Sequence, residues 1–353
     1  MVGLVVASGC MGGSKPSGTS PTTPVSSTAS SHSSTTQSTS SGPTSTGTST
    51  GTPQTSTTTT QIEELYWSSP WQYSTVKVEG REYKVTYYKV DYKIRPNQST
   101  PLYEYVIEKT LKKAKVHVYG TDFNGNKVDL GEKEVYEYTT VVVPVKAAQL
   151  KDRLVIKVWY LKESGDFFVY PWEATWFMYM NAGSNEDFVG FKFEYGDKSF
   201  TVTSPAPFQS GLMPYMEGTG DFMSDINQDL TNLYMGWLAA MQLGIWSALS
   251  DENLAVPRSG TWTDMMGHTW AWSTKPDGSV TFSGVKFKLV DAQWKYSGSP
   301  EGISMDGKAK IAPGLFLPVE VDGHFGYRDE ATGKSVVVYS HMKVEDLKLE
   351  KVS

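Results

Sequence analysis

Hydrophobic and polar residues alternate along most of the chain after Val76, which is the period of a half-buried β-strand. Within residues 82–94 the alternation changes phase at Tyr87-Tyr88, and this change indicates a β-bulge. Asn124-Gly125 is typical of a type I′ hairpin turn between two strands. The alternation predicts strands over residues 82–94, 115–120, 127–130, 134–145, 153–161, 167–180, 188–195 and 198–203.

One segment instead has apolar residues at steps of three and four, which predicts a helix over residues 221–249. After Leu233 the segment is apolar nearly all round, but Gln242 and Ser247 interrupt a stretch that is already short for a membrane span. We therefore expect a core helix. The preceding residues, 204–220, are rich in Pro and Gly and mark a candidate boundary between two regions.

Alternation returns after the helix and predicts turns at Pro276-Asp277-Gly278 and Asp306-Gly307. The strands predicted there cover residues 261–273, 279–290, 292–297, 303–312, 315–327 and 335–350. The order of sheet, helix and sheet predicts a β-dominated α+β fold. We expect antiparallel sheets, arranged as a sandwich or a curved half-barrel, packed around one long central helix.

The first sixty residues have a different composition. A short apolar run, Val2 to Ala7, precedes Ser8-Gly9-Cys10, and Cys10 is the one cysteine of the chain. Small residues before a cysteine are what a lipoprotein signal peptidase requires. Residues 14–60 are about two-thirds Ser and Thr. Such a segment has too few apolar side chains to offset the entropy of ordering, so we expect a disordered stalk.

This combination of a lipobox-like cysteine and a Ser/Thr-rich stalk resembles the cell-surface lipoproteins of archaea. The resemblance implies a lipid on Cys10, a membrane anchor and an extracellular location. The apolar run is shorter than the core of an ordinary signal peptide and no basic residue precedes it, so we expect translation to begin upstream. The predicted organisation is a signal remnant over 1–9, the lipidated N-terminus and stalk over 10–60, a β-rich region over 61–204, and the helix with a C-terminal sheet over 205–353. The last two regions can form one domain.

Charge excludes one class of partner. The formal net charge is −6, whereas nucleic-acid binding calls for clustered Lys and Arg. The densest basic run, Lys109 to Lys115, is interpreted as a solvated face of a strand or helix. No cofactor is expected. A single sequon, Asn97-Gln98-Ser99, makes Asn97 a candidate glycosylation site in an exported chain.

Two residue sets are weak candidates for binding a metal ion. Asp122, Asn124 and Asn126 repeat like the start of a calcium loop, but Lys127 and Lys133 stand where such a loop needs Gly and Glu, so we favour a plain hairpin turn.

The second set comes from the predicted hairpin of 315–327 and 335–350, which pairs Asp322 with His341. The same register pairs Glu320 with Lys343 and His324 with Tyr339. A carboxylate beside an imidazole can serve acid–base chemistry or a metal, yet a charged outer face explains it more simply.

The sequence contains no Gly-x-Ser-x-Gly, His-Glu-x-x-His, phosphate-loop or dinucleotide motif. We therefore expect a membrane-tethered protein that binds an extracellular ligand or partner, and not an enzyme. One alternative is a carrier of hydrophobic molecules, with an apolar cavity beside Trp237, Met241 and Ile245. Another is a carbohydrate-active enzyme, favoured by the many Trp residues and scattered carboxylates, for which the sequence nominates no catalytic residue.

Overall fold

The computed structural model describes residues 75–163, 187–218, 221–241, 257–263, 269–297, 302–313, 315, 317–329 and 332–352. Contacts divide the chain into two units, Met1–Thr59 and Thr60–Ser353, and all the described residues belong to the second. Cys10, the stalk, and the predicted strand over 167–180 lie outside the described residues. Within those ranges no helix is long and apolar enough to cross a membrane.

The described residues form one antiparallel sheet of fourteen strands and one helix. The first eight strands are β1 (Thr75–Val78), β2 (Arg81–Arg95), β3 (Tyr103–Thr121), β4 (Lys127–Lys146), β5 (Leu154–Tyr160), β6 (Phe188–Tyr195), β7 (Lys198–Thr203) and β8 (Met213–Gly218). The remaining elements are α3 (Met223–Met241), β9 (Arg258–Thr263), β10 (Thr269–Phe282), β11 (Val285–Ser297), β12 (Ser304–Ile311), β13 (Glu320–Arg328) and β14 (Ser335–Lys351).

Strands β3 to β8 close into a ring, because each pairs with the next in sequence and β8 returns to pair with β3. We call these strands the six-strand ring. The closing contact is short, Gly120 with Pro214 and Thr121 with Met213. The Thr203 hydroxyl strengthens it by donating to the Tyr119 carbonyl at 2.8 Å. A Cβ on Gly120 would lie 2.9 Å from the Leu212 side chain, so glycine allows this close approach.

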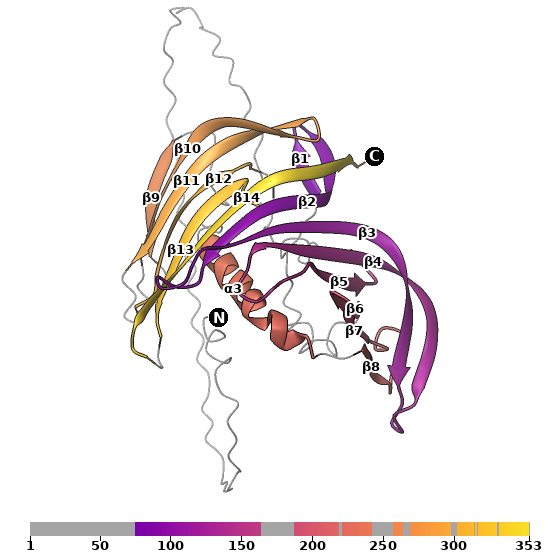
Figure 1. Ribbon diagram of the computed structural model, residues 1–353. Coiled ribbons are helices and arrows are strands. Elements are labelled where there is room, and N and C mark those ends of the chain that lie inside the picture. Colours follow the sequence, from indigo (N-terminus) through magenta and orange to yellow (C-terminus); the bar gives the residue numbers. More distant parts are fainter. Residues whose placement is uncertain are drawn as a thin grey trace, which may run out of the picture. The chain divides into compact units, whose positions relative to one another are not determined.

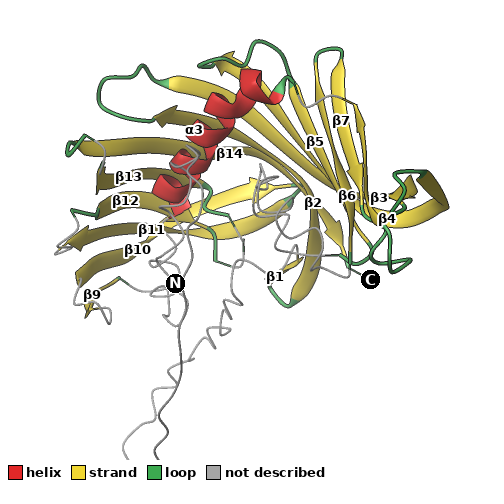
Figure 2. Cartoon of the chain, turned by 90° about the horizontal axis from the view of Figure 1, so that it is seen from below, coloured by secondary structure: helices red, strands yellow, loops and turns green. Residues whose placement is uncertain are grey.

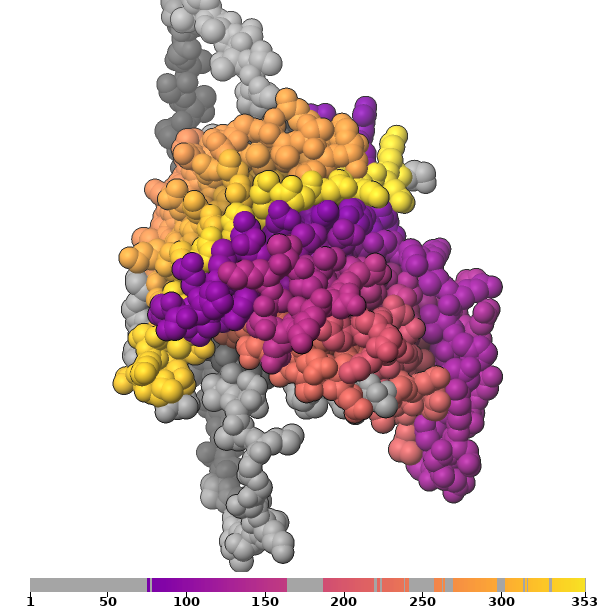
Figure 3. Space-filling model, in the orientation of Figure 1, coloured from indigo at the N-terminus to yellow at the C-terminus, as the bar shows by residue number. Residues whose placement is uncertain are grey.

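The other strands form an open sheet that continues from β3 in the order β2, β14, β13, β12, β11, β10 and β9 (Figure 1). The edge of β3 is therefore shared, since residues Tyr103 to Thr110 pair with β2 and only its last two residues pair with β8. Strands β2 and β14 come from opposite ends of the chain and lie side by side, as Figure 3 shows in indigo and yellow. One sheet thus includes strands from before and after residue 204.

Helix α3 lies across one face of the open sheet and contacts β2, β13 and β14 (Figure 2). Two glycines permit the close packing. A Cβ on Gly323 would lie 1.9 Å from the Ala239 carbonyl oxygen, and one on Gly236 would lie 2.4 Å from the Tyr92 hydroxyl oxygen. That hydroxyl donates to the Leu233 carbonyl at 3.0 Å. The β-rich antiparallel prediction is confirmed, whereas packing of sheets around a central helix is not.

A buried carboxylate in the helix links it to the first ring strands. Asp229 is 1% exposed and accepts a hydrogen bond from the Tyr105 hydroxyl of β3. It also accepts three consecutive backbone amides of the loop after β4, from Ala148, Gln149 and Leu150, at 2.8, 2.7 and 2.6 Å. These bonds satisfy the buried amide of Leu150 and the partly buried amides of Ala148 and Gln149.

The predicted bulge in β2 is confirmed, because the register with β14 skips Thr86 and the buried positions change phase there. The predicted type I′ turn at Asn124-Gly125 is wrong. The connection spans residues 122–126, and Gly125 alone in it has positive φ, at 83°. The Gly125 amide donates to the Asp122 carbonyl, which makes a longer loop.

The predicted turn at Pro276-Asp277-Gly278 is also wrong. Strand β10 runs through it with a bulge, and the turn falls at Ser283-Gly284, both of positive φ. The bulge is tolerated because β9 stops at the partner of Thr274, so Pro276 is not required to donate to a neighbour on that side. The turn predicted at Asp306-Gly307 lies inside β12.

Burial follows the alternation in most strands. Tyr88, Tyr92, Tyr105 and Tyr138 belong to the main hydrophobic core. Lys109 is 0% exposed, so the prediction of a solvated face is wrong for that residue, although Lys112, Lys113 and Lys115 are exposed. Lys109 lies on the inward-facing side of β3, in phase with the apolar residues around it.

Candidate ligand-binding groove

The open sheet carries its polar side chains on the face opposite the helix. In β10 to β13 the buried residues, such as Trp270, Trp294 and Val321, alternate with exposed ones. Gly323 faces α3, so its neighbours Asp322 and His324 point to the other side. Register then aligns these polar side chains across four strands.

This face contains an open groove of about 670 Å³, a volume in the range of small-ligand sites. We call it the polar groove. Its lining comes from β10 to β13 and consists of Ala271, Trp272, Ser273, Gln293, Trp294, Lys295, Asp306, Gly307, Lys308, Asp322 and His324. The wall of the groove on β10 is shallow because Ala271 and Ser273 have small side chains. Longer polar side chains form the opposite wall.

Two indole rings lie behind the groove, and each occupies the space that a side chain would fill at a glycine on the neighbouring strand. A Cβ on Gly307 would lie 2.5 Å from the Trp294 ring, and one on Gly260 would lie 3.0 Å from the Trp272 ring. Each ring therefore covers the glycine paired with it across the sheet. Trp294 is only 4% exposed. The polar face rests on a rigid aromatic layer, which holds the groove residues in place.

A hydrogen-bonded cluster lies at the side of the groove on β13 and β14. Asp322 accepts from the Tyr339 hydroxyl at 2.9 Å and from His341 Nδ1 at 2.9 Å. Its second oxygen, Oδ2, lies 3.3 Å from Lys308 Nζ. The predicted pairing of Asp322 with His341, and of His324 with Tyr339, is confirmed by the register. All the contacts of Asp322 come from groups that can donate, so this carboxylate positions its neighbours.

Both acid groups of this cluster have shifted pKa values. Burial would raise the pKa of Asp322, but hydrogen bonds from His341 and Tyr339 outweigh it and hold the pKa below its usual range. Burial raises the pKa of Tyr339 to about 12, and the bond to Asp322 adds to the rise. At neutral pH Asp322 is therefore an anion and Tyr339 a neutral donor. Neither is poised to transfer a proton.

A second carboxylate–imidazole pair lies on the next row of the same face. His324 Nδ1 is 3.1 Å from Asp306 Oδ2, and the His324 ring packs at 5.2 Å against Tyr339. Of the groove's two lysines, Lys308 is paired with Asp322, whereas Lys295 has no ion-pair partner among the described residues. Lys295, Gln293 and Ser273 thus direct polar groups into the groove without competing partners in the described part of the chain.

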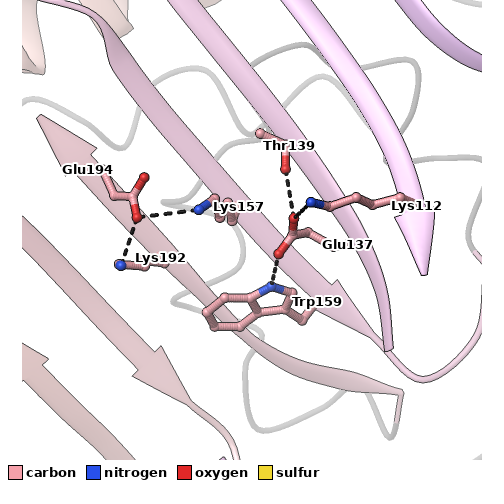
Figure 4. Close-up of polar contacts among 7 residues, drawn as sticks. All are labelled: Lys112, Glu137, Thr139, Lys157, Trp159, Lys192 and Glu194. Atoms are coloured by element: carbon pink, nitrogen blue, oxygen red, sulfur yellow. Dashed lines mark hydrogen bonds and ion pairs between the residues drawn. The ribbon is translucent and has the colours of Figure 1, made fainter. Parts of the chain in front are cut away.

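A similar carboxylate lies in the six-strand ring but is closed to ligands (Figure 4). Glu137 accepts from the Trp159 indole at 3.0 Å, from the Thr139 hydroxyl at 3.1 Å, and pairs with Lys112 at 3.1 Å. Burial opposes its ionisation, but these partners hold its pKa below the usual range. Glu137 is 7% exposed, so the cluster joins strands instead of facing solvent.

The remaining predicted site residues are scattered. Asp122 accepts from the Asn124 and Asn126 amides at 2.8 Å each, and Asn126 Nδ2 donates to it at 2.9 Å. The oxygens of Asp122 are thus engaged within their own loop. Asn97 lies in the loop after β2, where its Oδ1 accepts from the Ser99 amide. Its glycosylation stays a prediction.

Only part of the predicted apolar cavity lies in the described residues. Trp237 is 3% exposed and belongs to the core. Ile245 and the side chain of Met241 lie outside what the structure describes. In the described ranges no group of three or more His, Cys, Asp or Glu side chains is arranged to hold a metal.

Sequence reasoning singled out Asp322 and His341 but missed the β10 and β11 side of the groove. Ser273, Gln293 and Lys295 are ordinary polar residues in predicted strands. Their phase within the alternation could have placed them on the exposed face, but nothing local indicates that β11 lies two strands from β13.

No protein-family model matches this chain, and no curated protein matches it. Among solved structures, it is similar to the crystal structure of a candidate lipoprotein from Parabacteroides distasonis, with 10% sequence identity. The similarity covers 74% of this chain and 95% of that chain, at a TM-score of 0.18. At that score the likeness carries no argument about fold or function.

Proposed function

We propose that this chain is an archaeal-type cell-surface lipoprotein whose β-rich domain binds an extracellular ligand in the polar groove and does not transform it. The observation that carries the binding proposal is the groove itself, a volume of about 670 Å³ lined by polar side chains on a rigid sheet. Non-enzymatic binding is favoured because Asp322 is held as an anion by donors and Tyr339 as a neutral donor.

The proposed anchor rests on the sequence around Cys10. A lipid on this residue would hold the chain at a membrane, and the Ser/Thr-rich segment would space the domain from the surface. This part of the proposal predicts that full-length Cys10→Ser moves from the membrane to the soluble fraction and loses incorporated lipid label. The double variant Cys10→Ser/Ser17→Cys keeps a thiol outside the lipobox and should behave the same way. Lipid label on either variant would contradict the anchor.

Occupancy of the groove is tested by filling it. Ala271 is exposed and small, so Ala271→Trp should block the groove without disturbing the core. Thr281→Trp, at an exposed position on the same strand and outside the groove, is the matched control. We expect native mass spectrometry of the full chain, purified from its own cells, to show a bound mass in the wild type and in Thr281→Trp.

The same measurement should show no bound mass in Ala271→Trp. A chain without a bound mass in every variant, or a mass that persists in Ala271→Trp, would overturn the groove as the binding site.

A further inference from the structure

The polar groove has a chemical character that narrows its ligand. Its ionised side chains are two lysines and two aspartates. Lys308 pairs with Asp322, and Asp306 lies 3.1 Å from His324, an imidazole that cancels its charge only when protonated. Lys295 projects from β11 beside the neutral groups Gln293 and Ser273 and opposite Asp306, and it forms no ion pair among the described residues. A ligand carboxylate would therefore meet one lysine that forms no ion pair, together with several hydrogen-bonding groups.

The dimensions of the groove favour an extended ligand. It crosses four adjacent strands, which are spaced about 4.8 Å apart, so its floor spans about 14 Å. The side chains repeat at this spacing along two rows, Ala271–Lys295–Asp306–His324 and Ser273–Gln293–Lys308–Asp322, and all of them except Ala271 are polar. A chain of pyranose units presents hydroxyl groups at a comparable repeat, and hydroxyls can both donate to the aspartates and accept from the lysines.

Resting on the function proposed above, we infer that the polar groove binds an acidic glycan, with a sugar carboxylate paired to Lys295 and hydroxyl groups bound by Gln293, Ser273 and the aspartates. The carboxylate gains a charge-assisted hydrogen bond without breaking an existing ion pair. A neutral glycan would leave Lys295 unpaired. A small carboxylate without hydroxyls would leave the two polar rows unused.

The test is a calorimetric titration of the full chain carrying Cys10→Ser. The probes are trigalacturonate, the uncharged galactose trisaccharide of the same linkage, and citrate as a carboxylate that is not a sugar. We expect trigalacturonate to bind at least about tenfold more tightly than either of the others, because the neutral trisaccharide lacks the charged hydrogen bond to Lys295 and citrate lacks the sugar hydroxyls that reach the two polar rows. Binding should weaken as salt is added, since ions screen exposed charges.

Lys295→Ala should weaken trigalacturonate binding about tenfold or more, and Lys295→Glu should abolish it. Lys288→Ala is the matched control, because Lys288 is also exposed on β11 and has no ion-pair partner within the described residues. Its affinity should equal that of the wild type. Equal binding of the neutral trisaccharide, citrate binding as tight as trigalacturonate, or equal loss in the two alanine variants would overturn the inference.

The two proposals fail in different ways. Suppose that trigalacturonate does not bind, but that the bound mass seen by native mass spectrometry in the wild type is absent from Ala271→Trp. The groove is then a binding site for another class of ligand, and the acidic-glycan inference alone is wrong. If the bound mass is still present in Ala271→Trp, the proposed binding site itself is wrong.

Discussion

The six-strand ring and the open sheet share β3 and the same antiparallel pairing. Each contains a hydrogen-bonded carboxylate cluster, but the two clusters differ in their exposure to solvent. In the ring, the Glu137 side chain is 9% exposed and bonds to an indole, a hydroxyl and a lysine. In the open sheet, Asp322 has three partners as well, but its side chain is 22% exposed and borders a groove. The two clusters therefore differ in solvent access and not in the number of partners.

The difference follows from what covers each sheet. The outer face of the ring near Trp159 carries a second small hydrophobic cluster with Val118, Val135 and Val189, and Phe208 from the segment after β7 packs against it. The outer face of β10 to β13 presents mostly polar side chains that are exposed or partly exposed. Three pairs of substitutions test whether the two regions differ as described.

The largest effect is expected where the two regions are joined. Asp229→Ala removes the acceptor for the Tyr105 hydroxyl and for three loop amides, of which the Leu150 amide is buried and those of Ala148 and Gln149 are partly buried. We expect the free energy of unfolding to fall by about 4 kcal/mol. Chemical denaturation of the full chain measures this change.

Asp225→Ala is the control for that experiment. Asp225 lies on the same helix, but it is exposed and its one ion pair, with Lys198, spans 3.6 Å. Its removal should cost less than about 1 kcal/mol. Equal losses in the two variants would show that α3 is not tied to the ring through Asp229.

An intermediate effect is expected where the helix meets the open sheet. In Gly323→Ala the added Cβ would lie 1.9 Å from a helix carbonyl oxygen, which cannot move without displacing α3. We expect a loss of about 2–3 kcal/mol in thermal or chemical denaturation. Gly326→Ala, on the same strand, would meet only the flexible Ser304 hydroxyl, at 2.3 Å, and should cost less than about 1 kcal/mol. A larger loss at Gly326 would contradict this packing.

The smallest effect is expected when the carboxylates Glu137 and Asp322 are replaced by their amides and the two losses of stability are compared. At pH 7, Glu137→Gln should lower the free energy of unfolding by about 2 kcal/mol, and Asp322→Asn by less than about 1 kcal/mol. The folded-state pKa of Glu137 lies below its unfolded value. Its contribution is therefore complete above the unfolded value of about 4.3 and is lost as pH falls through the folded pKa.

Stability measured from pH 7 to pH 3 checks this sign. The wild type should lose more stability than Glu137→Gln below about pH 4.3, since the glutamine has no charge to lose. Parallel curves for the two proteins would contradict a stabilising, ionised Glu137.

Local pattern predicted most of the strands, but not β1, β8 or the first half of β3. Of the two carboxylate–imidazole pairs beside the groove, it predicted Asp322 with His341 and not Asp306 with His324. The pairing of Asp322 with His341 could be predicted because β13 and β14 are joined by a short connection and alternate in phase. The bulge at Thr86 could be predicted because the alternation of apolar and polar residues changes phase within β2 itself. The turn predicted at Asp306-Gly307 is absent, because Gly307 lies within a strand and its lack of a side chain leaves space for the Trp294 ring. The sequence alone does not distinguish a glycine that allows a turn from one that leaves space for a neighbouring side chain.

The ring and the groove could not be predicted, because both depend on pairings between distant strands. Strand β8 is short, contains Pro214 and lies in the Pro/Gly-rich passage that predicted a boundary. Its pairing with β3 closes the ring through two residue pairs. The groove likewise needs β10 to β13 to be adjacent and in register, which no single segment shows.

The pairing of β2 with β14 has a consequence for how the protein is made. Tyr83 pairs with Lys351, so β2 finds its partner only after about 250 further residues, up to the end of β14, have been synthesised. Until then the edge of β2 is an unpaired template for other strands. Contacts of such long sequence separation also slow folding. A chain of this topology needs chaperone protection most in the interval between the synthesis of β2 and that of β14, while its sheet is still incomplete.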